Sequence, residues 1–323
     1  MTIEPAVLHA LNAIAPVREN EPLSRHTTIG IGGHADAYLA LDTLDQITSV
    51  LEVAHDAGLP VFMLGSGSNI VVGDNGMRGI TIENNANALS DPSPLRGLAQ
   101  GEEAPGSSPS YLIRAEAGAS FAAMSRQLAF AGYEGLEWAC GIPGTVGGAV
   151  VYNAGAYGGC LGDVLQRIAV WDPQHGVIEY GAKELGLVYR GSAFTRGLMS
   201  GRAVLWAEFA LWRSDPTELR ARVADYDARR LKAQPRGRNA GSFFKNPPEH
   251  PAWRLLDSAG LRGYQIGGAQ FSEKHCNFLI NTGDATAADV AALKRLAQER
   301  VRDQFGLELQ NEVSLVGEGF GDE

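Results

Sequence analysis

The sequence predicts an α+β fold, and three observations support this. Short apolar runs of the length of buried strands alternate with longer amphipathic runs of helical period. Three apolar segments (165–173, 176–180 and 203–212) follow one another closely enough to form an antiparallel set. The composition changes after residue 213, where a charged helical segment leads into a second region of helices and strands.

The elements before residue 165 are placed by their end signals. Residues 43–58 predict a helix that Thr43 caps and Gly58 ends. A strand at 35–41 precedes it, and a short buried strand at 61–64 follows it. The remaining predicted elements are extended segments at 69–72 and 80–82, a strand at 111–118 and a helix at 120–132.

The region after residue 213 begins with a charge-rich helix at 215–235, which Pro235 ends. Its further predicted elements are a helix at 252–261, a strand at 276–281, a long helix at 285–306 and a strand at 312–317. We expect an N-terminal helix within residues 1–20, a first region of 21–213 and an α/β region of 214–323. Residues 84–110 are rich in Asn, Ser, Pro and Gly, and we expect a mobile surface insertion there.

Composition limits the classes of function. A net charge of −10 argues against a general binder of nucleic acid or anionic membranes. No stretch has the length and apolar character of a membrane span, and the first residues lack a signal-peptide pattern, so we expect a cytoplasmic protein. Cys140, Cys160 and Cys276 show no CxxC spacing, which favours free thiols in a reducing compartment. The histidines are scattered, and we expect no metal site.

Glycine-rich loops are the strongest local signal. GSGSN at 65–69 follows a strand but leads into an extended segment, so it is no dinucleotide-binding fingerprint; it is either a plain turn or a backbone cradle for a diphosphate. In EWACGIPGTVGGAVVYNAGAYGG (137–159) the glycines and Pro143 leave little side chain to pack. Such a segment is costly to fold unless a large, flat ligand lies on it.

Three other residues are ambiguous by themselves. Arg190 in YRGSAF could be a solvent-exposed arginine, Glu312 in NEVSLVG could lie at a strand edge, and Ser242 in GSFFKNP could be a turn hydroxyl. No GxSxG motif accompanies Ser242, which argues against a hydrolase.

Taken together, the motifs resemble those of one family, the FAD-containing UDP-N-acetylenolpyruvoylglucosamine reductases of peptidoglycan synthesis. The matching stretches, in chain order, are HTTIGIGGHA, LGSGSNIVVGDNGMRG, GIPGTVGGAVVYNAGAYG, YRGSAF, NAGSFFKNP, AGLRGYQIGGAQFSEKHCNFLIN and NEVSLVG. The resemblance implies a two-part FAD-binding region of the vanillyl-alcohol-oxidase (PCMH) type, followed by an α/β substrate-binding domain. Residues 195–215 are too short for the substrate-binding tyrosine insertion of one branch, so the chain resembles the shorter branch.

The resemblance also implies roles for individual residues. Ser242 would donate a proton, with Arg190 and Glu312 as its catalytic partners. Tyr189, Lys245, Asn246 and Gln265 would contact the UDP-sugar. FAD, bound without a covalent link, would lie on Gly65, Ser66, Gly67, Ser68, Asn69, Gly141, Ile142, Pro143, Gly144, Gly147 and Gly148.

The implied reaction uses NADPH as co-substrate. NADPH reduces FAD, the flavin N5 delivers hydride to the enolpyruvyl ether of UDP-N-acetylglucosamine-enolpyruvate, and Ser242 protonates the adjacent carbon. No nucleic acid, membrane or obligate protein partner is implied. Two alternatives are a flavin oxidase of the same cofactor fold and a UDP-sugar-binding protein without catalysis. The GSFFKNP and NEVSLVG pair argues against the oxidase, and the presence of Ser242, Arg190 and Glu312 argues against the binding protein.

Overall fold

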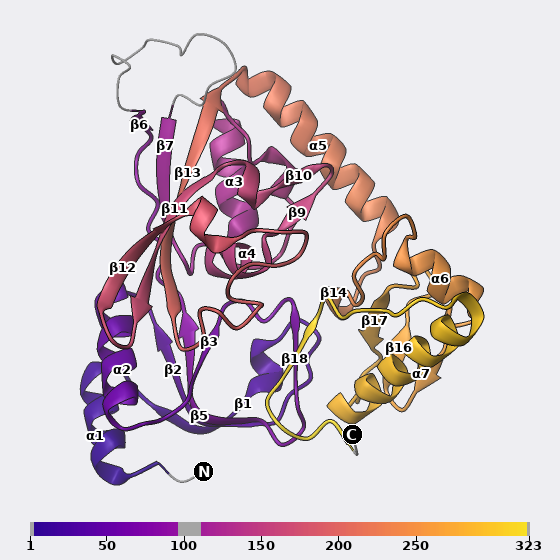
Figure 1. Cartoon of the computed structure of the whole chain (residues 1–323), viewed down its shortest axis with the longest axis horizontal. Helices are drawn as coiled ribbons and strands as arrows, with labels where there is room; N and C mark the ends of the chain where they lie inside the picture. Colours follow the sequence, from indigo (N-terminus) through magenta and orange to yellow (C-terminus); the bar gives the residue numbers. More distant parts are fainter. Residues whose placement is uncertain (1–2, 96–110, 322–323) are drawn as a thin grey trace. The chain divides into compact units, whose positions relative to one another are not determined.

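The computed structural model describes residues 3–95 and 111–321, and the chain divides into two compact units (Figure 1). The first unit comprises Met1–Leu39, Gly58–Ile82 and Leu231–Glu323. The second unit comprises Ala40–Ala57 and Glu83–Arg230. Both units therefore combine segments that lie far apart in the sequence.

The N-terminal part of the first unit is a sheet with strand order β1-β2-β5-β3. Most residues of β2 are buried, and Ala35 and Tyr38 from this strand belong to one apolar cluster with Leu64 at the end of β3. The predicted N-terminal helix is present as α1. The elements are α1 (Pro5–Ile14), β1 (Arg18–Pro22), β2 (His34–Leu41), β3 (Val61–Leu64), β4 (Ile70–Val72) and β5 (Met77–Asn84).

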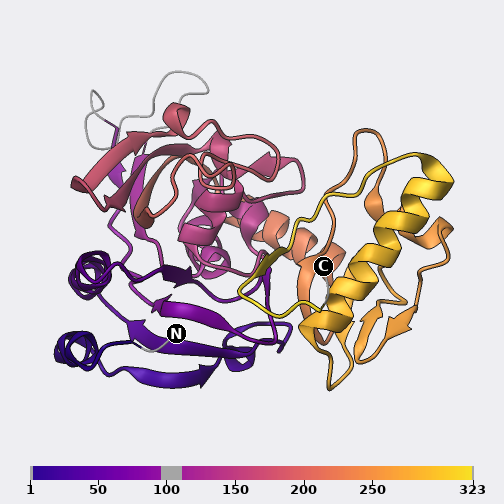
Figure 2. The same ribbon diagram turned by 60° about the horizontal axis from the view of Figure 1, so that its bottom comes forward.

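The C-terminal part of the first unit is a second sheet, antiparallel in its described pairings, with order β14-β17-β16-β15. Helix α7 lies along this sheet, as both views show, and α6 packs on α7 (Figure 2). Thr286 and Asp289 form a capping box at the start of α7, and Gly306 in the left-handed conformation ends it. The elements are β14 (Arg238–Ser242), α6 (Ala252–Ser258), β15 (Gln265–Ile266), β16 (Ala269–Phe271), β17 (Phe278–Asn281) and α7 (Ala287–Phe305).

The last strand, β18 (Ser314–Val316), differs from expectation in its partner. It was predicted as part of the C-terminal α/β region, but it pairs in parallel with β4, so that Ser314 lies opposite Ile70 and Val316 opposite Val72. Asp74, in the turn after β4, accepts hydrogen bonds from the backbone N–H groups of Ala287 and Ala288 at the start of α7. Backbone and side-chain bonds therefore join the two parts of the first unit.

Phe243 and Phe244 are fully buried although they follow only a short strand. Their rings meet edge to face with centroids 5.0 Å apart. Both belong to one apolar cluster that also contains Ile29, Val71 and Val313, which come from three other segments of the chain. This burial, at about 25 cal/mol per Å² of apolar surface, makes the Phe pair an anchor for the loop that contains it.

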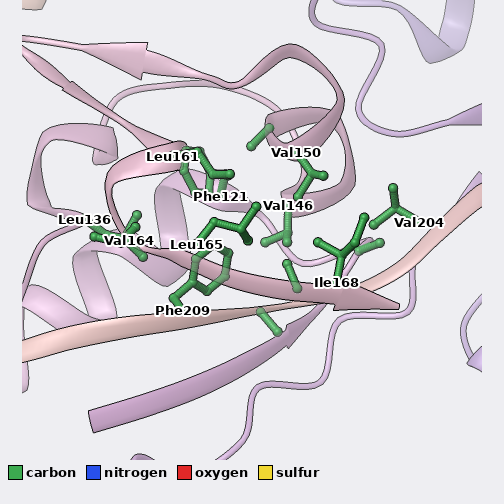
Figure 3. Close-up of a cluster of buried hydrophobic side chains, with 14 of the residues drawn as sticks. Phe121, Leu136, Val146, Val150, Leu161, Val164, Leu165, Ile168, Val204 and Phe209 are labelled. Carbon is green, nitrogen blue, oxygen red and sulfur yellow. The ribbon is translucent and has the colours of Figure 1, made fainter. Parts of the chain in front are cut away.

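The second unit is organised around a sheet of order β12-β11-β13-β7-β6, with β8 also paired to β13. The predicted antiparallel set is confirmed, since β11 pairs antiparallel with both β12 and β13. Figure 3 shows Val146 and Val150 of α4 pointing toward Ile168 and Leu165 of β11. The elements are α2 (Leu44–Asp56), β6 (Ser93–Pro94), β7 (Tyr111–Glu116), α3 (Phe121–Phe130), β8 (Tyr133–Glu134), α4 (Val146–Tyr152), β9 (Gly155–Ala156), β10 (Gly159–Cys160), β11 (Leu165–Asp172), β12 (Gly176–Gly181), β13 (Ala203–Arg213) and α5 (Pro216–Ala233).

The described part of the segment 84–110, for which we expected a mobile surface insertion, has regular hydrogen-bond partners. Residues 84–95 run along β7: Ala86 is fully buried, Ser90 bonds to the backbone of Arg114, and β6 pairs with β7. The Asn- and Ser-rich composition hid this edge strand, because its hydrogen bonds are made by backbone and short polar side chains. Residues 96–110 lie outside the described part of the chain.

Within residues 3–95 and 111–321, no helix has both the length and the apolar character needed to cross a membrane. The three cysteines are free thiols, as predicted, with Cys140 and Cys276 buried.

Burial should make the native thiols unreactive. Desolvation raises the pKa of Cys276 to about 12, and it also raises the pKa of Cys140, with nearby Asp227 as the next cause. Because the thiolate is the reactive form, we expect neither residue to react with a disulfide reagent at pH 8 in the native protein. Mass spectrometry of the labelled protein should place any slow label on Cys160, and urea should expose all three; rapid labelling of Cys276 would contradict the expectation.

Candidate functional site

Ser242 lies at a break in the sheet. Arg238 pairs with Asn281 and Asn239 with Ile280, but Ser242 pairs with Phe278, so one extra residue bulges between Asn239 and Ser242. Gly241 takes a φ of +84° there, and its N–H donates to the Asn239 side chain at 3.0 Å. The bulge ends the regular ladder and fixes the backbone direction at Ser242.

The backbone after Ser242 meets the segment that contains Glu312. The carbonyl oxygen of Phe243 accepts hydrogen bonds from the N–H groups of Glu312, at 2.8 Å, and Val313, at 3.3 Å. Lys245 N–H donates to the carbonyl of Gln310 at 2.8 Å. Ser242, predicted as a catalytic partner of Glu312, is therefore the neighbour in sequence of the residue to which the Glu312 backbone bonds.

The GSGSN loop connects β3 to β4 and joins the same network. Asn69 donates from its side-chain amide to the carbonyl of Glu312 at 3.1 Å, and its own carbonyl accepts from Ser314 N–H. Thr28 links the loop to β14, because its N–H donates to the carbonyl of Gly67 and its hydroxyl donates to the carbonyl of Asn239 at 2.7 Å. The GSGSN loop (65–69), the GSFFKNP loop (241–247, here called the serine loop) and residues 310–314 (the glutamate segment) thus form one bonded structure in the first unit.

Only glycine fits at position 67. Its φ is +61°, and a Cβ there would lie 2.1 Å from the carbonyl oxygen of His26. Ser66 and Ser68 flank it with their hydroxyls hydrogen-bonded to each other at 3.2 Å. The result is a tight loop of Gly65–Asn69 with small hydroxyl side chains, the kind of backbone surface that a diphosphate can approach closely.

Three residues predicted to contact the sugar nucleotide belong to the first unit. Lys245 and Asn246 lie in the GSFFKNP loop, and Gln265 lies on the hairpin of β15 and β16. Lys245 is partly buried and Asn246 is exposed. The Asn246 side-chain oxygen accepts from the N–H of Ala252 at 2.9 Å, which fixes the amide at the start of α6. Gln265 is exposed on β15 and donates to the carbonyl of Gly267 at 2.8 Å.

In the second unit, the glycine-rich segment forms a tight turn and the short helix α4. Thr145 caps this helix by accepting from the N–H of Gly148. The N–H groups of Val146 and Gly147 donate to the carbonyls of Ala119 and Ala117. These two N–H groups are therefore bonded within the protein. A cofactor on this segment would instead approach backbone that carries no side chains. At Gly148 there is open space, since the Thr145 hydroxyl, 3.7 Å away, is the one atom of the described residues that a Cβ would meet.

The other residues predicted for this loop precede α4. Ile142 N–H donates to the carbonyl of Ala139 at 2.9 Å, and Pro143 follows it without an N–H. Gly144 takes a φ of +129°, which a side-chain-bearing residue rarely adopts. Bare backbone along this turn is compatible with a flat aromatic cofactor.

Gly141 at the start of the loop packs against an arginine. A Cβ at Gly141 would lie 2.8 Å from Cδ of Arg230, whose pKa is lowered by burial. Nearby on the same unit, Tyr157 stacks on Tyr226 with ring centroids 4.6 Å apart, and burial raises the pKa of Tyr157. Sequence reasoning missed this group, although Tyr157 lies within the NAGAYG motif.

Arg190 lies in a tight turn that is bonded to α4. The N–H groups and carbonyls of Val188 and Gly191 bond to each other across Tyr189 and Arg190, and Arg190 takes a φ of +51°. Two buried side chains fasten this turn: Asn153 donates to the carbonyl of Val188 at 2.9 Å, and Ser192 donates to the carbonyl of Val151 at 2.6 Å.

The structure therefore gathers the predicted site residues into two sets. Ser242, Glu312, Lys245, Asn246, Gln265 and Gly65–Asn69 belong to the first unit, and Gly141–Gly148, Tyr189 and Arg190 to the second. The side chains of Asn153, Ser192 and Asn277 form hydrogen bonds to backbone groups in or beside these loops, and the sequence did not single them out. Buried side chains that bond to backbone give no local pattern, but the motifs NAGAYG, YRGSAF and HCNFLIN contain all three.

Comparison with known proteins gives consistent matches. Residues 233–316 match the family profile "UDP-N-acetylenolpyruvoylglucosamine reductase, C-terminal domain", and residues 35–180 match "FAD binding domain". The UDP-N-acetylenolpyruvoylglucosamine reductase of Agathobacter rectalis is 42% identical over 93% of this chain and 94% of its own. That of Geobacter metallireducens is 40% identical over 94% of each chain.

A solved structure agrees with these matches. The crystal structure of UDP-N-acetylenolpyruvylglucosamine reductase from Thermus caldophilus covers 93% of this chain and 99% of its own, with a TM-score of 0.73 and 31% identity. The predicted α+β fold with an FAD-binding region is therefore confirmed, and so is FAD as the cofactor.

The expected cofactor role of the GSGSN loop can be tested with a matched pair of glycine variants. Gly67→Ala combines a left-handed φ with a backbone collision, whereas Gly58→Ala has nearly the same φ, +62°, and no atom within 4 Å of the new Cβ. We expect Gly58→Ala to cost about 1–2 kcal/mol from backbone strain alone. Gly67→Ala should cost more and should weaken FAD binding, measured by urea unfolding and by FAD titration of the apo-protein. Equal losses of stability and of FAD affinity in the two variants would contradict a special role for Gly67.

Proposed function

We propose that this chain, which belongs to the family of UDP-N-acetylenolpyruvoylglucosamine reductases and is an FAD-dependent oxidoreductase, catalyses the reaction for which the family is named. The substrate is then UDP-N-acetylglucosamine-enolpyruvate, and the product is UDP-N-acetylmuramate, a precursor of peptidoglycan. The observation that supports this most directly is the bonding of the Ser242 loop to both the Glu312 segment and the GSGSN loop within one unit.

The proposed reaction adds a hydride and a proton across the vinyl bond of the enolpyruvyl ether. NADPH would be the source of the reducing equivalents, and FAD, when bound, would supply the hydride-transfer chemistry at the vinyl bond. Gly65–Asn69 and Gly141–Gly148 hold the cofactor through close backbone approach, with no covalent link. Besides the bound cofactor, two small molecules take part, NADPH and the UDP-sugar, and no nucleic acid, membrane or second protein is needed. Both are cytoplasmic metabolites, so we place the reaction in the cytoplasm.

Ser242 supplies the proton in this proposal. When the hydride reaches the terminal carbon, negative charge develops on the adjacent carbon and spreads onto the substrate carboxylate. A proton must then reach that adjacent carbon, and a hydroxyl fixed at a defined position can deliver it. The bulge at Gly241 and the buried Phe243–Phe244 pair hold the Ser242 backbone on both sides.

Glu312 and Arg190 stabilise the charges in this step. Arg190 carries a guanidinium, which neutralises the developing charge on the substrate carboxylate. Glu312 polarises the site, as a hydrogen-bonded partner or as a protonated acid. Its N–H is bonded to Phe243 and its carbonyl to Asn69, so its backbone has little freedom.

The remaining polar residues orient the UDP-sugar. Lys245 attracts the diphosphate by charge. Asn246 presents its side-chain N–H₂ as a donor, since its oxygen is occupied by Ala252 N–H. Gln265 presents its side-chain oxygen, since its amide nitrogen bonds to Gly267, and Tyr189 contributes an exposed aromatic ring.

We expect the FAD to be released completely when the holoprotein is denatured in acid. His34 and Cys140 have no feature that assigns them to flavin attachment, and Cys140 is buried with a raised pKa, which disfavours the reactive thiolate. The measurement is the flavin absorbance of the supernatant after precipitation. Yellow colour that remains with the pellet would contradict a non-covalent cofactor.

A Ser242→Ala variant should separate the two halves of the reaction. Reduction of the flavin by NADPH needs no proton from Ser242, so anaerobic bleaching should proceed at nearly the wild-type rate. Reoxidation by UDP-N-acetylglucosamine-enolpyruvate should slow by ~10²–10⁴, the usual effect of losing a general acid. Both rates are followed by flavin absorbance in stopped flow.

Ser242→Cys is the control, because it keeps a proton on a side chain of similar size and should retain more reoxidation activity than alanine. A wild-type reoxidation rate in Ser242→Ala would assign the proton to another donor. Loss of both half-reactions would mean that the loop positions the flavin. A protein that consumes NADPH with oxygen alone would be an oxidase, and one that binds the UDP-sugar without reduction would be a binding protein.

A further inference from the structure

We propose that Asn277 is a positioning residue for the proton donor, because its buried side chain holds the backbone that follows Ser242. This inference rests on the function proposed above, in which Ser242 protonates the substrate. Asn277 makes no contribution to the chemistry in this account; it acts only through the place it gives to the Ser242 loop.

Asn277 bonds to two consecutive residues of the loop. Its side-chain oxygen accepts from the N–H of Phe244 at 2.9 Å, and its side-chain nitrogen donates to the carbonyl of Phe244 at 2.8 Å. Its own backbone carbonyl accepts from the N–H of Phe243 at 2.7 Å. The amide therefore pairs with Phe244 as a neighbouring strand would.

This pairing replaces a sheet ladder that ends at Ser242. The register between β14 and β17 shifts at the bulge, and Ser242 opposite Phe278 is its last pair. Phe243 N–H still bonds to the backbone carbonyl of Asn277, but the carbonyl of Phe243 bonds to the Glu312 segment. The N–H and carbonyl of Phe244 both bond to the Asn277 side chain, where a regular strand would have met backbone. Ser242 is thus fixed between a bulge on one side and the Asn277 clamp on the other.

Burial makes the clamp strong. Asn277 is 3% exposed, and Phe244 is fully buried. Without the amide, the N–H and carbonyl of Phe244 would lose their partners in a place that water does not reach, which favours a shift of the peptide.

Such a shift would reach both proposed catalytic residues. The carbonyl of Phe243, in the peptide that Asn277 helps to hold, also accepts from Glu312 N–H. A misplacement of about 1 Å in a catalytic group can cost ~10²-fold in rate. The clamp therefore sets the position of Ser242 relative to Glu312.

Asn281, the last residue of β17, offers a matched control, since Asn277 directly precedes the same strand. It is also a buried asparagine, 7% exposed, whose nitrogen donates to the carbonyl of Ile29 at 2.9 Å and whose oxygen accepts from Gly283 N–H at 2.9 Å. It makes a comparable number of buried bonds but contacts neither Phe243 nor Phe244 through them. Replacing either asparagine should lower the stability of the fold, but only the replacement of Asn277 should slow protonation of the substrate.

The experiment compares Asn277→Ala, Asn277→Ser and Asn281→Ala, each alone and with Ser242→Ala. In the apo-proteins, hydrogen exchange followed by mass spectrometry reports the amides of Phe243 and Phe244. These should exchange at least about tenfold faster in the Asn277 variants and unchanged in Asn281→Ala. In the holoproteins, NADPH bleaching should stay near wild type in all three. Reoxidation by UDP-N-acetylglucosamine-enolpyruvate should slow ~10- to 100-fold only in the Asn277 variants.

The double variants decide between positioning and general structure. If Asn277 acts only through Ser242, then Asn277→Ala should slow reoxidation no further once Ser242 is alanine. Full additivity would overturn the positioning role while leaving the proton donor in place. A wild-type reoxidation rate in the single variant Ser242→Ala would overturn the proposal that Ser242 donates the proton. The positioning role of Asn277 would then be overturned as well. Asn277→Ser keeps the test available if Asn277→Ala does not fold, and equal loss of both half-reactions in it would also overturn the proposal.

Discussion

The parallel pairing of β18 with β4 is the constraint on which the first unit depends. It brings a segment from the end of the described chain beside the loop that follows β3, and it places the Glu312 backbone where Asn69 and Phe243 can bond to it. Each of these bonds contributes only about 1 kcal/mol by itself. Together with the buried Phe243–Phe244 pair, they leave few ways for the serine loop, the glutamate segment and the glycine loop to move independently.

The local elements of this fold were largely predictable. Helix α2 begins after Thr43, which caps it by accepting from Gln46 N–H, and α7 begins with a capping box and ends at Gly306, as their end signals indicate. The apolar runs at 165–173 and 203–212 are indeed the paired strands β11 and β13. Such features depend on residues that are close together in the sequence, and the printed sequence contains all of the information that they need.

What could not be predicted depends on contacts between distant residues. The partner of β18 is a strand of the N-terminal part, and no property of the sequence 312–317 selects it over the C-terminal sheet. Residues 84–95 resemble a disordered linker in composition, but they find hydrogen-bond partners along β7. For the site, the motif resemblance supplied the side chains that we propose as reactive. Asn153, Ser192 and Asn277 instead bond to backbone groups of other segments and left no local signature.

The bond between Asn69 and Glu312 joins residues that are 243 positions apart, and this separation has a consequence for biosynthesis. A ribosome makes the chain from its N-terminus, so the GSGSN loop emerges long before its partner exists. During that interval the loop has neither the Asn69–Glu312 bond nor the strand that pairs with β4. Contacts of such long range also form slowly, because the intervening chain must be ordered first. Loading of the flavin should therefore follow completion of the chain, and a nascent polypeptide that stops short of residue 312 should remain colourless.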